Sequence, residues 1–597
     1  MEKTNKVLVA VNLGINLGKK KSILFAGDWC EKKKYTEKII NREHEFFPSI
    51  FDKDNLLQFK KEITRIRNII QPILFEKLNL IHNTNFKKKF WNLIVDPWLG
   101  NYLAYNYVRW HTIESILKLN KNVNLEFDTF ELEAKSFVSY DLQSSFITPN
   151  LSSDVYNQFF YQKVIEYFKD FSNINIVKNN EKLIYETKKI YKFNKFNFYL
   201  RKIFNSIKKK FIDKNRVYLN AYEINRLELV KINIALKQFP INPGFFFSEK
   251  TFKTLISTDL MSYDVDLRNK ISFEVKNNFS FENFIINRIK YDLPNYLVEN
   301  FDKIIRYVKN LNFHQKYIVT GGDHFYNILF KFWMAFNKDK ESKILTLDHG
   351  IHNGVEKGDI YYQEEIGDIN IGFYKQMKSK EIQLPSIRLS KYIDLREKKS
   401  KPEKLLFVSY DSMIYPENIL ISPICSKSKY VIEYFETLTK YLDSDILSKT
   451  LIRPTFKKHY PFSWVKDEMI HKFSKKFKII ENNYFNYFKN SKVVVCTYPQ
   501  TSFAEALISG PALLLTKLNY WPYFDKFVKL KEELIDAKII FESPEEAAKH
   551  INEIWNDPYI WWESKKVENA KKRFINETAL VSEKALEKFV NYLKTLN

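Results

Sequence analysis

The chain has 597 residues, of which 45% are hydrophobic and 28% are charged, with 51 Phe and 36 Tyr. This length exceeds what one hydrophobic core serves, so at least two domains are expected, and the composition excludes a disordered chain. The 95 Lys and Arg outnumber the 71 Asp and Glu and give a net charge of +24, which favours anionic partners such as nucleotides, anionic lipid or nucleic acid without choosing among them.

Cysteine use and hydropathy indicate a reducing compartment. Cys30, Cys425 and Cys496 lie far apart with no CxxC pair, so neither a disulfide framework nor a zinc site is indicated. No apolar run approaches the length needed to span a bilayer, and the run before Asn12 is too short for a secretion signal. We therefore expect a cytoplasmic protein whose membrane contact, if it has any, is peripheral at the inner face of the plasma membrane.

The N-terminal half alternates between strand-like and helix-like patterns, as α/β proteins do. Short apolar runs that stop at glycine or polar residues predict strands, and apolar residues spaced three and four apart predict helices. The strands are expected at 6–11, 22–26, 316–322 and 344–350, and the helices at about 55–82, 98–119 and 325–336. The last three segments of the half, strand, helix and strand, have the pattern of a βαβ unit, whose sheet is parallel.

A basic stripe lies at about 191–212, where Phe196, Leu200 and Ile203 share one helical face and lysines fill much of the rest. This pattern resembles a helix at an anionic membrane surface. A basic surface helix packed on the domain gives the same pattern, so both interpretations stay open.

A charged stretch at Leu395–Lys404 predicts the linker to a second α/β domain. We expect an N-terminal domain at 1–395 with helical insertions, a C-terminal domain at 396–575 and a last helix at 576–597. Strands of the second domain are expected at 404–409, 450–453, 477–480, 492–496, 512–515 and 538–541. Ser543, with Pro and Glu after it, predicts a capped helix start.

The sharpest local pattern is the strand, turn and helix of CTYPQTSFAEALISG, from Cys496 to Gly510. Thr501 and Ser502 stand at the expected helix start, where free amides and the positive helix end suit a phosphate. Tyr498 lies in the turn, and Glu505, about one turn inside, has the carboxylate to accept ribose hydroxyls. An ordinary helix cap is the alternative.

Two basic residues follow another strand of the same domain. Arg453 and His459 in LIRPTFKKHYP have the chemistry of a phosphate clamp, since arginine binds phosphate through two donors. Surface placement is the alternative for each.

Acids and histidines end both strands of the βαβ unit. Asp323 and His324 follow the first strand, and Asp348 and His349 follow the second. Such groups within hydrogen-bonding reach are candidates for acid/base chemistry. A zinc site that adds His352 is the competing reading, but no recognised metal spacing is present, so no metal is expected.

Five further residues are candidates for the same cleft. Asp28 and Trp29 follow the second strand, where a plain turn with a buried Trp is the alternative. Arg109 has the charge to meet a substrate carboxylate and Trp98 the ring for a sugar face, although core packing explains Trp98 equally well. Glu365 follows the second strand of the βαβ unit closely.

The common catalytic fingerprints are absent from the sequence. No P-loop, GxSxG elbow, GxGxxG fingerprint or kinase motif set occurs. This argues against the most frequent ATP, hydrolase and dinucleotide chemistries.

A series of motifs in fixed order carries a family resemblance. The segments are ILFAGDWC, LIHN, FWNLIVDPWLGNYLAYNYVRW, TGGDHFYNILFKFW, LDHG, YYQEEIGD, TYPQTSFAE and SPEEAAKHINEIWNDPYIWW. Together they resemble the bacterial LIC-type transferases of surface-polysaccharide and flagellar glycan loci, over nearly the whole chain. The resemblance extends to GT-B transferases that use CMP-activated ulosonic acids, including Kdo and pseudaminic acid transferases.

The resemblance implies a GT-B-like α/β fold with two Rossmann-like domains facing a cleft and extra N-terminal helices. It implies a donor nucleotide on the C-terminal domain, at Arg453 and the turn of Tyr498, Thr501, Ser502 and Glu505. The acceptor would be a glycan, a lipid-linked glycan or flagellin on the N-terminal domain, with catalysis between the two.

The preferred hypothesis is transfer of a sugar, a nonulosonic acid from its CMP form, without cofactor or metal. Asp323 would act as nucleophile or general base, His324 or His349 would ease departure of the phosphate, and Asp28 is a second candidate carboxylate. A pairing of nucleophile and general acid would imply a retaining reaction. The alternatives are polyol-phosphate transfer, as in teichoic acid polymerases, and a basic membrane-binding scaffold; the cleft acids argue against nucleic acid as a partner.

Overall fold

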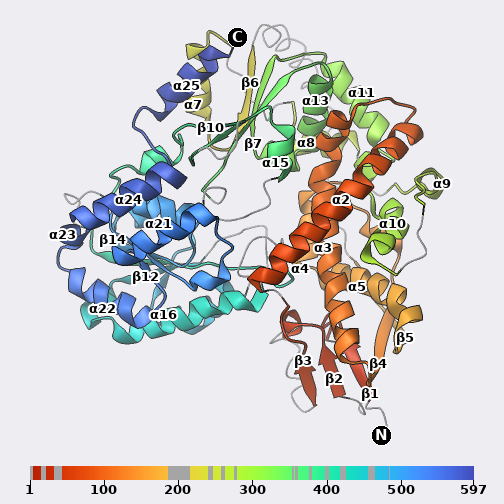
Figure 1. Ribbon diagram of the computed structural model, residues 1–597, viewed down its shortest axis with the longest axis horizontal. Coiled ribbons are helices and arrows are strands. Elements are labelled where there is room, and N and C mark those ends of the chain that lie inside the picture. Colours follow the sequence, from red (N-terminus) through yellow and green to blue (C-terminus); the bar gives the residue numbers. More distant parts are fainter. Residues whose placement is uncertain are drawn as a thin grey trace.

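The fold is described from a computed structural model, shown in Figure 1. The structure describes residues 5–14, 22–31, 43–50, 52–185, 216–239, 246–256, 262–274, 279–351, 355, 361–375, 380–396, 402–416, 425–454, 464–482 and 484–596. The basic stripe at 191–212, His352 and His459 lie outside these residues.

The N-terminal residues form a five-stranded parallel sheet, called the N-terminal sheet. Its strands are β1 (Asn5–Val9), β2 (Ser22–Phe25), β3 (His44–Phe46), β4 (Asn124–Glu131) and β5 (Ile174–Lys182). Their order is β3-β2-β1-β4-β5, and every neighbouring pair is parallel. The two predicted strands of this region are confirmed as β1 and β2.

Long helices join this sheet to the next one, and α2 and α3 run alongside each other between the two sheets (Figure 1). The main helices here are α2 (Lys53–Ile81), α3 (Lys88–Leu119), α5 (Asp154–Phe168), α10 (Phe281–Asp292) and α11 (Phe301–Leu311). Asp52 caps α2 by accepting from the amides of Asp54 and Asn55. Most residues of α3 are buried, so α3 forms the centre of this layer.

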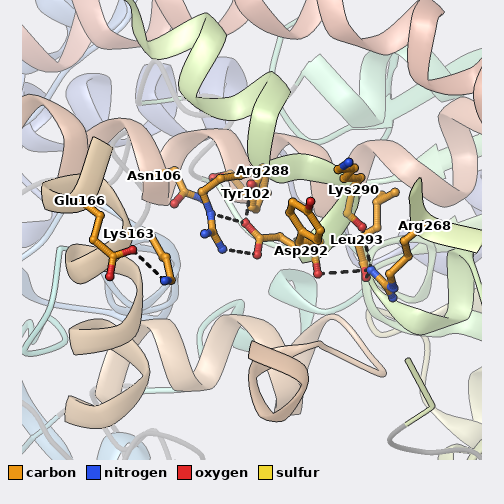
Figure 2. Close-up of polar contacts among 10 residues, drawn as sticks. Tyr102, Asn106, Lys163, Glu166, Arg268, Arg288, Lys290, Asp292 and Leu293 are labelled. Atoms are coloured by element: carbon orange, nitrogen blue, oxygen red, sulfur yellow. Dashed lines mark hydrogen bonds and ion pairs between the residues drawn. The ribbon is translucent and has the colours of Figure 1, made fainter. Parts of the chain in front are cut away.

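Buried arginines tie the helices of this layer together (Figure 2). Arg288 donates to both carboxylate oxygens of Asp292, at 3.0 and 2.6 Å, and Tyr102 of α3 donates to the same carboxylate at 2.7 Å. Arg268 donates to the backbone carbonyls of Lys290 and Leu293 near the end of α10. A buried charge needs such partners, so this cluster fixes how α10 sits on α3.

The second sheet, called the middle sheet, is also parallel and five-stranded. Its strands are β6 (Val217–Ala221), β7 (Tyr317–Gly321), β8 (Lys343–Leu347), β9 (Ile369–Gly372) and β10 (Glu381–Gln383). They lie in the order β10-β9-β8-β7-β6. The helix α13 (Ile328–Asp339) connects the parallel neighbours β7 and β8, which confirms the predicted βαβ unit. On one face of the sheet, Tyr218 of β6 packs on Trp333 of α13.

The C-terminal sheet contains all six strands predicted for the second domain. They are β11 (Lys404–Val408), β12 (Thr450–Arg453), β13 (Lys478–Ile479), β14 (Ser491–Cys496), β15 (Ala512–Leu515) and β16 (Ile540–Phe541). Their order β13-β12-β11-β14-β15-β16 is parallel throughout and is the doubly wound, Rossmann-type order.

Helices surround the C-terminal sheet, and shorter ones complete the three units. Around the sheet are α16 (Tyr430–Tyr441), α20 (Thr501–Ser509), α21 (Asp525–Asp536), α22 (Pro544–Ile554) and α24 (Lys565–Thr578). The others are α4 (Thr148–Ser152), α7 (Arg226–Ala235), α8 (Glu249–Leu255), α9 (Val265–Asn269), α12 (Asp323–Tyr326), α15 (Tyr361–Ile366), α17 (Ser444–Ser448), α18 (Lys466–Phe473), α19 (Tyr484–Lys489), α23 (Pro558–Trp562) and α25 (Ala585–Thr595). Ser543 caps α22 by accepting from the amide of Glu546, as predicted.

Two crossings connect the middle and C-terminal sheets. Arg396, in the predicted linker, is buried and donates to Ser509, Pro511 and Ala506 of the C-terminal unit. Burial lowers the pKa of its guanidinium to about 10. The chain later returns, and α25 packs beside α7 on the outer face of the middle sheet (Figure 1).

These sheets establish a GT-B-like α/β fold, as the sequence predicts: two parallel α/β units joined by a linker and a returning C-terminal helix. One feature is additional. The region expected as a single N-terminal domain at 1–395 contains two separate sheets, because β1 to β5 pair only with one another. The last helix, expected at 576–597, is α25, and α24 ends at Thr578.

Among the described helices, none has both the length and the apolar character required to cross a lipid bilayer.

The returning helix predicts a test of the fold. Phe589 of α25 is 1% exposed and packs against the middle sheet, whereas Ile560 of α23 is 75% exposed. We expect Phe589→Ala to lower the free energy of unfolding by about 3 kcal/mol or more, because it leaves a cavity. Ile560→Ala should change it by less than about 0.5 kcal/mol. Urea unfolding followed by circular dichroism measures both, and equal effects would contradict the docking of α25.

Candidate active site

The carboxyl ends of the middle and C-terminal sheets meet, and polar side chains gather there. Glu223 follows β6, Asp323 and His324 follow β7, and His349 follows β8. Since β6, β7 and β8 are adjacent and parallel, these residues leave the sheet at the same edge. The structure brings His324 and His349 close enough for His349 to lower the pKa of His324, and the predicted meeting of all four groups after β7 and β8 stays a prediction.

Asp323 is held by three donors. Its carboxylate accepts from Tyr222 Oη at 2.5 Å, from Asn220 Nδ2 at 2.9 Å and from Asn327 Nδ2 at 3.3 Å. The preceding Gly322 has φ of +104°, and a Cβ there would lie 2.1 Å from the Tyr222 ring. Only glycine therefore allows the turn that brings Tyr222 over Asp323.

His324 is buried behind Asp323. Its Nδ1 lies 3.1 Å from Thr320 Oγ1, and among the described residues its Nε2 has no hydrogen-bond partner. Burial, with the nearby positive groups His349 and Lys331, lowers the pKa of His324 to about 3. Lys331 is itself fully buried, which lowers its pKa to about 7. With this pKa, the His324 imidazole is neutral at physiological pH.

His349 has a different environment. Its side chain is exposed to solvent, yet surrounding protein lowers its pKa, and the charge of Arg388 lowers it further. His349 is thus the histidine of this group that a substrate can reach.

The opposite side is the turn between β14 and α20. Thr501 begins the helix as predicted, and no side chain caps this end among the described residues. Tyr498 Oη and Ser502 Oγ lie 2.7 Å apart. The guanidinium of Arg453, at the end of β12, stacks 3.7 Å from the centre of the Tyr484 ring. Phe503 and Ala504 donate their amides to the Gln500 carbonyl, so this end offers an anion the amides of Thr501 and Ser502 and the helix dipole.

An arginine that the sequence did not single out joins the two sides. Arg388 lies just before the short helix η7 (Leu389–Tyr392) and donates to Glu505 of α20 at 2.9 Å. Its other terminal nitrogen lies 3.8 Å from Glu223 of the middle sheet. Burial raises the pKa of both Glu505 and Glu223, although Arg388 opposes the shift. No local pattern marks Arg388, because its partners are distant in sequence.

Three predictions of substrate contact are corrected, because their side chains are buried. Trp98 stacks on Tyr102 in the core of α3, and Trp29 donates to the carbonyl of Ala10. Arg109 donates to Asn150 and Asn157 within the helical layer. The core-packing alternative holds for both tryptophans, since aromatic area is buried more readily than exposed.

The structure shows where two other candidates, Glu365 and Asp28, lie, and their predicted roles stay predictions. Glu365 of α15 is exposed and pairs with Arg67 of α2. Asp28 belongs to the short helix η1 (Asp28–Cys30) after β2, on the N-terminal sheet and so on a different sheet from Asp323. That corner contacts the C-terminal unit, where Lys429 pairs with Glu31 at 3.0 Å.

Metal ligands do not gather in the described part of the chain. No group of three or more His, Cys, Asp or Glu side chains there is arranged to hold an ion.

A family model for the LIC12162 family transferases matches residues 7–593. The chain belongs to this family. The predicted LIC-type resemblance is thereby confirmed, and the LIC12162 protein described here is a transferase by family. No curated protein matches it.

Several solved structures are similar to parts of this LIC12162 transferase. MurG from Acinetobacter baumannii has a TM-score of 0.29 at 13% identity and covers 49% of this chain and 77% of its own. The wall teichoic acid polymerase TagF with CDPG has a TM-score of 0.33 at 11% identity, covering 67% and 98%. The glycosyltransferase SnogD from Streptomyces nogalater has a TM-score of 0.30 at 7% identity, covering 62% and 90%. At these TM-scores the likenesses carry no argument about function.

The buried Glu223 predicts how stability depends on pH. Its ordinary pKa of 4.5 is raised to about 7 in the folded protein, by burial first, with Glu505 adding and Arg388, Ser386 and Lys391 opposing. Because the folded state binds the carboxyl proton of Glu223 more tightly than the unfolded state does, the contribution of Glu223 to the free energy of unfolding is least favourable above pH 7. We expect Glu223→Gln to raise the free energy of unfolding at pH 8 by on the order of 2 kcal/mol and to lose this gain towards pH 5.

Urea unfolding at pH 5 and pH 8 measures the effect. Glu228→Gln, on α7 and paired with Lys391, is the matched control and should show no such difference. An effect of Glu223→Gln that is the same at both pH values would contradict the raised pKa.

Proposed function

We propose that this transferase moves a sugar from a nucleotide donor to a glycan, a lipid-linked glycan or flagellin. The supporting observation is that an uncapped helix start with Arg453 and Glu505 lies across from Asp323, His324 and His349. One side has the chemistry to hold a nucleotide phosphate and ribose, and the other to assist bond exchange. The donor we propose is a CMP-activated nonulosonic acid, such as pseudaminic or legionaminic acid or Kdo.

The donor would bind at α20. The amides of its first turn and the hydroxyls of Thr501 and Ser502 would hold the phosphate, with Arg453 nearby on β12. Glu505 would accept ribose hydroxyls. A CMP-sugar carries one phosphate, and arginine with a helix start neutralises that charge without a divalent metal.

Transfer would take place at the end of β7 and β8. Asp323, oriented by Tyr222 and Asn220, would serve as the general base or nucleophile. His349, which solvent reaches, would assist departure of the phosphate, and neutral His324 would position the groups around it. A covalent role for Asp323 would make the reaction retaining.

Peripheral contact with an anionic membrane stays a prediction from the basic stripe at 191–212. Replacing Lys208, Lys209 and Lys210 by Glu should reduce sedimentation with anionic vesicles. Unchanged sedimentation would remove this proposal.

Nucleotide selectivity tests the donor assignment. In a thermal-shift titration with CMP, CDP, UDP, GDP and ADP, we expect the largest rise in melting temperature with CMP, because a ligand of the native state stabilises it. Ser502→Ala and Arg453→Ala should reduce the shift. A preference for UDP or GDP would move the donor to another sugar class, and no shift at all would favour the scaffold alternative.

Asp323→Asn separates binding from chemistry. The variant keeps the size of the side chain and loses its charge, so we expect an unchanged nucleotide shift and at least about a 100-fold loss of transfer. A transfer assay with CMP-sugars and isolated acceptor glycans measures the loss. Transfer of glycerol phosphate or another polyol phosphate from a CDP-polyol donor to the acceptor, with release of CMP, would instead support the polyol-phosphate alternative.

A further inference from the structure

Arg388 is placed between the donor side and the catalytic side of the site. It belongs to the segment that links the middle sheet to the C-terminal unit, and its side chain is 44% exposed. It contacts Glu505 on one side and approaches Glu223 on the other, and its charge acts on His349. Among the described residues, no other arginine contacts the polar edges of both sheets.

We propose that Arg388 binds the phosphate of the donor nucleotide and exchanges its hydrogen bond with Glu505 for that phosphate. This inference rests on the proposed nucleotide site at α20. The exchange frees the Glu505 oxygen that Arg388 held for the ribose hydroxyls, while Tyr392 keeps its hydrogen bond to the same carboxyl group. Donor binding would thus replace the contact between Arg388 and Glu505 by two contacts to the nucleotide, one from Arg388 to the phosphate and one from Glu505 to the ribose.

The position of Glu505 supports this assignment. It lies four residues after Thr501, so Arg388 contacts α20 only about 6 Å along the axis from its first residue. That distance is about the span of a nucleoside phosphate group. Arg388 therefore needs only a side-chain rotation to reach an anion at the helix start.

The N–H groups of Arg388 also support the assignment of this residue to the phosphate. Among the described residues the guanidinium makes one hydrogen bond, from Nη2 to Glu505, while Nη1 is too far from Glu223 for another. A guanidinium carries five N–H donors and binds phosphate through two of them at once. Spare donors on an exposed arginine beside a helix start suit a phosphate better than they suit a purely structural ion pair.

The charges around Arg388 explain how the site persists without an anion. Glu505 is in electrostatic contact with both Arg388 and Arg453, and Glu223 adds a second buried carboxyl beside Arg388. These acids hold the cationic groups in place. An arriving phosphate takes over that role, because it is a stronger acceptor for a guanidinium than a carboxylate that must also serve ribose.

Calorimetric titration with CMP and with cytidine tests the proposal. If another nucleotide stabilises the protein most, that nucleotide and its nucleoside replace CMP and cytidine. We expect Arg388→Ala to weaken CMP binding by at least about 10-fold, the value of one charge-assisted hydrogen bond, and not to weaken cytidine binding, because cytidine has no phosphate for Arg388 to bind. Arg388→Lys should recover part of the loss, since it keeps the charge without the planar fork.

Lys391→Ala is the matched control. Lys391 lies on the same segment, has the same 44% exposure and pairs with Glu228 at 2.7 Å rather than with Glu505. It should leave CMP affinity unchanged, and melting curves of all variants show that each is folded.

The outcomes separate the two proposals. If Ser502→Ala and Arg453→Ala weaken CMP binding and Arg388→Ala does not, the nucleotide site stands and the role of Arg388 is wrong. Equal weakening of CMP and cytidine by Arg388→Ala would also overturn it, because a structural ion pair would not distinguish them. A wild-type protein that binds no nucleotide would overturn both.

Discussion

Parallel strand pairing is the constraint on which this structure depends. All three sheets are parallel throughout, so each places the loops that carry its polar residues at one edge. The middle and C-terminal sheets turn these edges toward each other, and the ion pair between Arg388 and Glu505 lies where they meet. Without that arrangement Asp323, on β7, and Ser502, after β14, would belong to unrelated surfaces.

The sequence was sufficient for most of the fold, since parallel strands are short, apolar and bounded by turn residues. All six strands of the C-terminal sheet follow this rule. Membership of a sheet does not follow from such a pattern: nothing in ILFAG reveals that β2 pairs with β1 and β3 rather than with β7. The separate N-terminal sheet therefore became visible only in three dimensions.

The candidate site was predictable where local sequence sets geometry. Thr501 and Ser502 are placed by a strand, a turn and a helix that are continuous in the chain, and His324 and His349 by two adjacent strands. Trp98 and Arg109 were misplaced, because an aromatic or arginine side chain on a helix such as α3 fits the core as well as a cleft. Arg388 and Glu223 were missed, because their contacts join residues more than a hundred positions apart.

Electrostatics give the two sides of the site different capacities. On the middle sheet, burial keeps His324 neutral and weakens the charge of Lys331, so little positive charge is fixed there. On the other side the guanidinium groups of Arg388 and Arg453 both act on Glu505 and oppose the rise of its pKa that burial causes. In the proposed reaction, negative charge that develops on a departing phosphate would therefore be stabilised on the side of α20, opposite Asp323. The proposed transfer would accordingly run from a donor at α20 toward an acceptor at β7.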